Sequence, residues 1–178
     1  MMTLLLGTIL ALVWASQAHH HDTDITAEKI SGRWITLYMA ANDTSLVQTN
    51  GPLRCYMSSI DPAWNENIRF NFYVKNSEEC LPVSIVAKKS PESGHYIVDY
   101  EGHNTLDIKK LSNDYLMLHT QNENDGVVSH ATALLGRRSR LSDKSILSEY
   151  SAFNTPWDIV KENIIEVQSE DTCTSKST

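Results

Sequence analysis

Apolar and polar residues alternate with a period of two along most of this chain. In the segment 68–75, Ile68, Phe70, Phe72 and Val74 alternate with polar or amphipathic neighbours. This period places alternate side chains on opposite faces of a β-strand. The same alternation recurs along the chain, and the apolar sets are Leu53, Cys55 and Met57; Val83, Ile85 and Ala87; Tyr96, Val98 and Tyr100; Leu106 and Ile108; Leu116, Leu118 and Thr120; and Ala131, Ala133 and Leu135.

Turn-forming residues separate these runs. Examples are Asn50-Gly51-Pro52, the segment 90–94 and Asn124-Asp125-Gly126, which combine residues that favour tight reversals. Short strands joined by tight turns indicate antiparallel neighbours rather than βαβ crossovers. The pattern predicts an all-β domain in which eight antiparallel strands form an up-and-down β-barrel that closes on itself.

One segment has helical periodicity instead. Between Ser142 and Asn154, the apolar residues Ile146, Leu147, Tyr150 and Phe153 fall on one stripe. Ser142 is the expected N-cap, and Pro156 follows the expected end of the helix. A helix with one apolar stripe packs on the outside of the sheet, and the expected landing surface is Tyr115, Met117 and Leu134.

The first 18 residues form a predicted signal peptide. An apolar stretch that is too short to span a bilayer ends in the small residues Ser16-Gln17-Ala18, which suit signal peptidase. Residues 19–178 are then a single secreted domain, and no other stretch is apolar enough to cross a membrane. The formal charge of −7 argues against nucleic acid as a partner.

Cysteine and asparagine positions add two expected modifications. Three cysteines in a secreted chain imply one disulfide and one free thiol. Cys55 is in register with inward residues, whereas Cys80 lies at a strand end and Cys173 in the polar tail, so a Cys80–Cys173 bridge is expected. Asn42-Asp43-Thr44 is an N-glycosylation sequon in a predicted loop.

The interior of the predicted barrel is a candidate ligand site. Ala131 and Ala133 leave space there, and the alternative is a core filled by side chains. No inward position is charged, and Tyr100 and Thr120 are the expected polar groups, so the cavity suits a small neutral apolar molecule. The predicted lining residues are Leu53, Cys55, Met57, Ile68, Phe70, Phe72, Ile85, Val98, Tyr100, Leu106, Leu118, Ala131, Ala133 and Leu135.

Three motifs in order resemble those of the lipocalin family. They are Gly32-Arg33-Trp34, Asn113-Asp114-Tyr115 with Asn in place of the usual Thr, and Leu135-Gly136-Arg137. Cys80 and Cys173 match the positions of the usual family disulfide. The segments 100–105, 122–126 and 162–165 look most like the mammalian branch of odorant and pheromone carriers, urinary proteins and dander allergens.

This resemblance implies a secreted carrier of an odorant, pheromone or lipid-like molecule. Gly32, Trp34 and Arg137 are assigned to stability, with Trp34 plugging the closed end and the Arg137 guanidinium stacked over its indole. A receptor or a second copy of the chain is a possible protein partner.

Two other functions remain open. Cys55 has a placement similar to that of the nucleophilic cysteine in the prostaglandin-isomerising lipocalin, although a thiol in an apolar setting is expected to be inert. The chain is alternatively a milk or reproductive-tract lipocalin that acts through a protein partner. We expect no cofactor and no metal, because His95, His103, His119 and His130 lack metal-ligand spacing.

Overall fold

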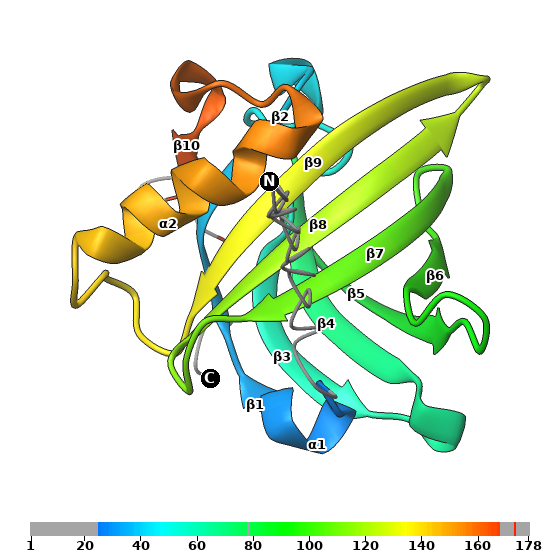
Figure 1. Cartoon of the computed structure of the whole chain (residues 1–178). Helices are drawn as coiled ribbons and strands as arrows, with labels where there is room; N and C mark the ends of the chain where they lie inside the picture. Colours follow the sequence, from blue (N-terminus) through cyan, green and yellow to red (C-terminus); the bar gives the residue numbers. More distant parts are fainter. Residues whose placement is uncertain (1–24, 78, 168–172, 174–178) are drawn as a thin grey trace, which may run out of the picture.

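In the computed structural model, one antiparallel sheet curls around an apolar interior (Figure 1). The structure describes residues 25–77, 79–167 and 173, so the predicted signal peptide lies outside the described residues. Ten strand segments occur in the order β1-β3-β4-β5-β6-β7-β8-β9-β2-β10. Their bounds are β1 Gly32–Arg33, β2 Ile35–Ala41, β3 Tyr56–Pro62, β4 Ile68–Asn76, β5 Glu79–Lys89, β6 Tyr96–Asp99, β7 His103–Lys110, β8 Tyr115–Asn124, β9 Val127–Gly136 and β10 Ile165–Glu166.

The first strand closes the barrel because it pairs on both sides. Its first part, β1, pairs with β3, with Gly32 opposite Ile60. Its continuation, β2, pairs with β9, with Ile35 opposite Gly136. Trp34 lies at the junction, and its backbone N–H donates to the Ser58 carbonyl over 3.1 Å. The predicted barrel architecture is confirmed; the segment count exceeds eight because the first strand is divided at Trp34 and because the short β10 is added beside β2.

A single longer helix, α2 (Ser145–Asn154), covers the outside of the barrel. Tyr150 is fully buried there in one cluster with Tyr115, Met117 and Leu134, so the predicted landing surface is confirmed. Tyr150 Oη donates to Thr132 Oγ1 over 2.9 Å, and Thr132 Oγ1 donates to Asn154 Oδ1 over 2.7 Å. The remaining helices in the described residues are α1 Ala27–Ile30 and four 3-10 turns, η1 Thr44–Leu46, η2 Trp64–Glu66, η3 Thr155–Trp157 and η4 Lys161–Asn163.

The start of α2 differs from the prediction. The helix begins at Ser145, and the Asp143 carboxylate accepts from the Ser145 backbone N–H over 2.8 Å. Ser142 does not cap the helix: its backbone N–H donates to the Tyr115 hydroxyl over 2.8 Å. The hydroxyl of a barrel tyrosine therefore holds the residue that the sequence pattern assigned to the cap.

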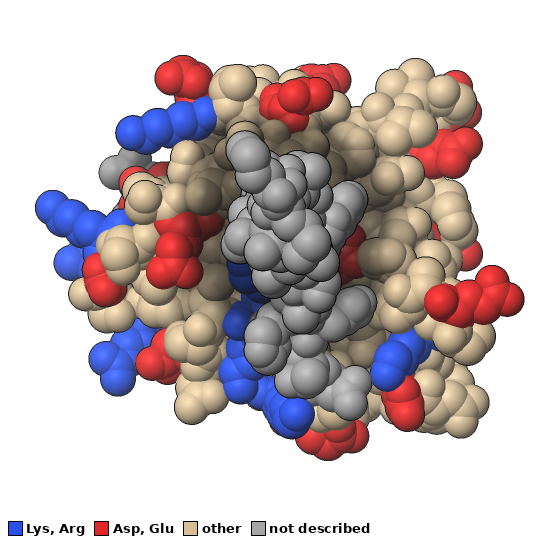
Figure 2. Space-filling view, viewed as in Figure 1, with Lys and Arg blue, Asp and Glu red and all other residues tan. Residues whose placement is uncertain are grey.

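The disulfide joins Cys80 of β5 to Cys173, as predicted, and Cys55 is a free thiol. The bridge ties the C-terminal part of the chain to the barrel wall across a sequence separation of 93 residues. Within the described residues, no helix is both long and apolar enough to cross a membrane. In the space-filling view, acidic and basic side chains are interspersed over the visible face (Figure 2).

Candidate functional site

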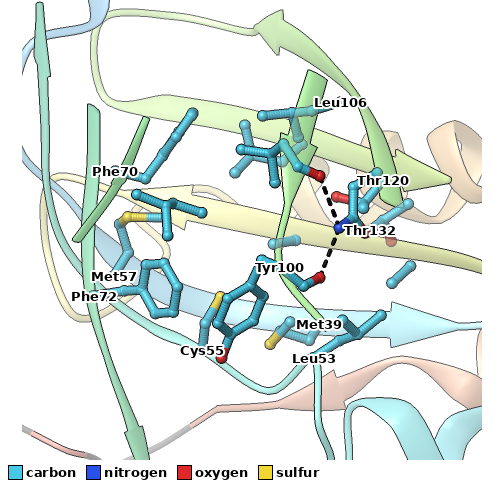
Figure 3. Close-up of a pocket in the computed structure, with 16 residues that line it drawn as sticks. Met39, Leu53, Cys55, Met57, Phe70, Phe72, Tyr100, Leu106, Thr120 and Thr132 are labelled. Atoms are coloured by element: carbon cyan, nitrogen blue, oxygen red, sulfur yellow. Dashed lines mark hydrogen bonds between the residues drawn. The ribbon is translucent and has the colours of Figure 1, made fainter. Parts of the chain in front are cut away.

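The barrel encloses a cavity of about 100 Å³ (Figure 3). Side chains from the segment before β3 and from β2 to β9 converge on it, because every second residue of each strand points inward. The lining residues are Met39, Leu53, Cys55, Met57, Phe70, Phe72, Ile85, Val98, Tyr100, Asn104, Leu106, Leu118, Thr120, Ala131, Thr132 and Ala133.

The structure brings together all the predicted lining residues except Ile68 and Leu135. These two face inward but are fully buried in the core, outside the cavity. Ile68 is the first residue of β4, opposite Pro62, and Leu135 lies next to the last residue of β9. Alternation predicts which face a residue occupies, but it does not predict the depth at which neighbouring side chains fill the barrel.

Four further lining residues were absent from the predicted set, namely Met39, Asn104, Thr120 and Thr132. Met39 belongs to the first strand, Ile35–Ala41, in which almost every residue is buried on one face or the other, so the sequence shows no alternation there. Asn104 is polar and for that reason does not stand out as an inward position. Thr120 was expected as a polar group of the interior, and its position on the wall agrees with that expectation.

The hydroxyl of Tyr100 is the main polar group on the cavity wall. Burial raises the pKa of Tyr100 to about 12, so the hydroxyl keeps its proton at neutral pH and can donate a hydrogen bond. The ring packs edge-on against Phe72, with 5.4 Å between centroids and 89° between planes. In Figure 3 the Cys55 side chain overlaps the Tyr100 ring on the side toward Phe72. The contact with Phe72 restricts the orientation of the Tyr100 ring.

Asn104, the other conspicuous polar residue, is already used by the backbone. Its amide nitrogen donates to the carbonyls of Val98 (3.1 Å) and Tyr100 (2.7 Å), drawn as dashed lines in Figure 3. Its amide oxygen accepts from Asn122 Nδ2 over 2.8 Å. Asn104 therefore stabilises the β6–β7 turn, and the hydroxyls of Tyr100 and Thr120 are the groups best placed to bind a polar atom of a ligand.

The free thiol of Cys55 is also on the wall. Burial raises its pKa to about 12, against a smaller opposing effect of the Arg54 charge. The Arg54 guanidinium donates elsewhere, to the Val47 carbonyl (2.8 Å) and the Tyr56 hydroxyl (2.9 Å). Within the described residues, no carboxylate or imidazole lines the cavity and could take the thiol proton. In this setting the thiol acts as a small apolar group.

A second pocket of about 290 Å³, here called the vestibule, adjoins the cavity at Leu53, which lines both. Asp43 and Glu101 supply its charges, and none of its lining residues is a lysine or arginine. Asn42 lies on this rim with its side chain exposed. Its amide oxygen accepts from the backbone N–H groups of His130 and Asp43, each over 3.0 Å. The rim is therefore acidic and combines polar with apolar residues, whereas the cavity lining is mostly apolar.

Comparison with known proteins agrees with this architecture. Residues 31–171 match the model of the lipocalin / cytosolic fatty-acid binding protein family. The chain is similar to major urinary protein 20 of Mus musculus, with 32% identity over 96% of this chain and 93% of that protein.

Solved structures give the same result. An odorant-binding protein superposes with a TM-score of 0.78 at 28% identity, covering 85% of this chain and 98% of that one. The possum milk whey lipocalin trichosurin, solved with bound 4-ethylphenol, superposes with a TM-score of 0.73 at 25% identity, covering 79% of this chain and 98% of that one.

Proposed function

Because this chain belongs to the lipocalin / cytosolic fatty-acid binding protein family, we propose that it is a secreted carrier that holds one small, neutral, hydrophobic molecule in its barrel. The observation that carries the proposal is the cavity itself, whose lining is mostly apolar, includes the hydroxyls of Tyr100 and Thr120, and has no charged residue. The ligand passes from water into the apolar cavity and is not changed chemically. The raised pKa of Cys55 favours this carrier function over the thiol isomerase.

The dimensions of the cavity favour a compact guest of the odorant or pheromone class over a long lipid. About 100 Å³ is small compared with the roughly 300–1,000 Å³ of pockets that take drug-sized ligands. A guest that buries about 250 Å² of apolar surface gains roughly 6 kcal/mol on leaving water. Part of that gain offsets the cost of association, so we expect an affinity on the order of micromolar.

Charge should be the strongest discriminator among guests of equal shape. A carboxylate would lose its hydration without gaining a cationic partner in the cavity, and it would pass the acidic residues Asp43 and Glu101 at the rim. A single hydroxyl, in contrast, can accept a hydrogen bond from Tyr100. We therefore expect neutral aromatic or aliphatic alcohols, ketones and similar volatiles as guests.

Three ligands with one scaffold test this proposal by calorimetry. 4-Ethylphenol carries a hydroxyl, 4-ethyltoluene carries no polar group, and 4-ethylbenzoate carries a negative charge. The phenol should bind most tightly, the hydrocarbon more weakly, and the benzoate at least tenfold more weakly than the phenol. Tightest binding by the benzoate, or no heat of binding with all three, would contradict the proposal.

We also propose that Asn42 carries an N-linked glycan at the rim of the vestibule. Its exposed side chain keeps the amide nitrogen for the sugar while the amide oxygen is held by two backbone N–H groups. Thr44→Ala removes the sequon but leaves Asn42 and these contacts in place, and Thr44→Ser retains the sequon as the matched control. Mass spectrometry of protein secreted by mammalian cells should find a glycan on the parent and on Thr44→Ser but not on Thr44→Ala, and a mature chain that starts at His19.

A further inference from the structure

Outside the cavity, a chain of hydrogen-bonded acidic and imidazole side chains crosses the outer face of three strands. Asp107 of β7 lies opposite His119 of β8, and its Oδ2 is 3.2 Å from His119 Nδ1. His119 Nε2 is 3.1 Å from Nδ1 of His130 on β9. His95, just before β6, bonds the other Asp107 oxygen. The proposed carrier function does not use these side chains, and the sequence pattern did not predict their association because they are far apart in the sequence.

The far side of His119 is covered by Trp157, which belongs to η3 just after α2. The two rings are parallel within 13° with centroids 3.7 Å apart, and His119 is only 4% exposed. Phe153 packs edge-on against Trp157 with a centroid distance of 5.1 Å. The imidazole of His119 is therefore the platform on which the segment after α2 rests against the barrel wall.

The hydrogen bonds limit how many protons the two imidazoles can hold. A carboxylate only accepts, so Nδ1 of His119 carries a proton toward Asp107. Between His119 Nε2 and His130 Nδ1, one nitrogen must donate and the other must accept. When one of the two imidazoles is protonated, one of the two facing nitrogens can still lack a proton and accept the hydrogen bond. When both imidazoles are protonated, both facing nitrogens carry a proton, so the hydrogen bond is lost and two positive charges lie side by side.

We propose that the Asp107–His119–His130 chain is an acid-sensitive latch that holds residues 155–158 against the barrel, closed while the imidazole pair carries at most one extra proton and open when both rings are cationic. In the closed state, His119 has Asp107 on one edge and the ring of Trp157 stacked on its face. In the open state, repulsion from His130 drives the His119 ring out of its buried position, and Trp157 loses its platform.

Charges on neighbouring elements determine the pH at which the latch opens. Burial lowers the pKa of His130 below the usual 6.5, and the nearby His119 lowers it further, whereas Asp158 after η3 opposes both effects. Burial opposes ionisation of Asp107, but hydrogen bonds from His119 and His95 and their charges outweigh it, and the pKa of Asp107 lies below its usual value. Lys109, on the same strand as Asp107, lies over the Phe153 ring at 6.0 Å.

The sign of the effect follows from the protons bound in each state. In the pH range just below 6.5, the unfolded chain binds more protons at His130 than the folded one does. The stabilisation from a neutral His130 is complete above that value and is lost as the pH falls. Asp107 stays ionised throughout this range, so the opening is governed by the imidazole pair.

Hydrogen exchange of the glycosylated, full-length secreted protein tests the latch without any ligand. The exchange rates are first corrected for their intrinsic pH dependence. Between pH 7.5 and 5, the corrected rate for residues 155–159 should then increase about tenfold relative to that of the rest of the barrel. His130→Gln should abolish this increase, because an amide can donate to or accept from His119 but takes no proton. His103→Gln is the matched control: His103 is bonded to Asp99 outside the latch, and its loss should leave the increase unchanged.

Ring-nitrogen NMR of the unmutated protein provides a second measurement that does not depend on a variant folding. His130 should take up its proton below pH 6.5, and this protonation should coincide with the faster exchange of residues 155–159. Protonation of His130 at a pH where the exchange does not change, or exchange of this segment that follows only the intrinsic pH dependence, would overturn the latch. The same increase in His130→Gln as in the parent would also overturn it.

Discussion

The guanidinium of Arg137 lies over the indole of Trp34, with Cζ 3.7 Å from the ring centroid. The same guanidinium donates to the carbonyls of Arg33 (2.7 Å) and Ser31 (2.9 Å). On the other side, Trp34 Nε1 donates to the Ile30 carbonyl over 2.6 Å. These contacts connect α1, the first strand and the end of β9 at the point where the barrel closes.

Replacing Arg137 should therefore destabilise the fold without altering the cavity. Arg137→Ala should lower the free energy of unfolding by about 2 kcal/mol, through loss of the cation–π contact and of charge-assisted hydrogen bonds. Urea unfolding measures this change, and Arg138→Ala, at an exposed neighbouring position, is the control. Equal effects of the two substitutions would show that the stacking contributes nothing.

Filling the cavity should abolish binding. Ala133→Trp places a large ring among Leu118, Leu106 and the other wall residues, at a cost in stability of about 1–3 kcal/mol from overpacking. The far-ultraviolet circular dichroism should remain that of a β-barrel, while displacement of a fluorescent probe disappears. Val160→Trp, at a position that is 53% exposed outside the barrel, is the control for adding a tryptophan. Unchanged probe binding by Ala133→Trp would refute the assignment of the site to the barrel interior.

Removing the hydroxyl of Tyr100 should affect only guests that carry a polar atom. Tyr100→Phe should weaken 4-ethylphenol by about 1 kcal/mol, or roughly fivefold, because a hydrogen bond in the cavity is lost. The affinity for 4-ethyltoluene should hardly change. Calorimetry on both ligands separates this effect from a general loss of packing, with Tyr73→Phe as control because Tyr73 does not line the cavity. Equal weakening of both ligands would assign Tyr100 a purely apolar role.

The thiol of Cys55 should react slowly in the folded protein. A shift of its pKa from 9.0 to about 12 leaves roughly a thousandfold less thiolate near pH 8 than an ordinary cysteine has. Labelling by iodoacetamide should accordingly be fast only after unfolding, and a bound guest should slow it further. Cys55→Ala should bind 4-ethylphenol about as well as the parent. Rapid labelling of the native protein would revive the hypothesis of a nucleophilic cysteine.

The period-two pattern predicted the strands from β3 to β9 with their inward and outward faces, because strand geometry fixes which side a residue occupies, but it did not show β2, in which almost every residue is buried. It also predicted the surface on which α2 packs, from Tyr115, Met117 and Leu134. It did not predict α1, which is a single short helix of four residues held by its contacts at the closed end of the barrel.

The alternation of apolar and polar residues could not predict properties that depend on contacts between distant parts of the chain. Ile68 and Leu135 face inward, as alternation requires, but only the assembled barrel shows that they are buried in the core outside the cavity. Asn104 is a polar residue on the inner face because its side-chain amide donates hydrogen bonds to the backbone carbonyls of Val98 and Tyr100 at the β6–β7 turn. The chain of Asp107, His119 and His130 forms only when three strands come into register, and each residue taken alone is an ordinary polar position on an outer face.

Closure through one strand also constrains the order of events during synthesis. β1 can pair with β3 soon after both have left the ribosome, but β2 has no partner in β9 until most of the chain has been made. Until then the barrel is open, and the apolar inner face with Phe70 and Phe72 is exposed to chaperones or to other nascent chains. Burial of the inner face is therefore completed only when β9 has been synthesised and can pair with β2.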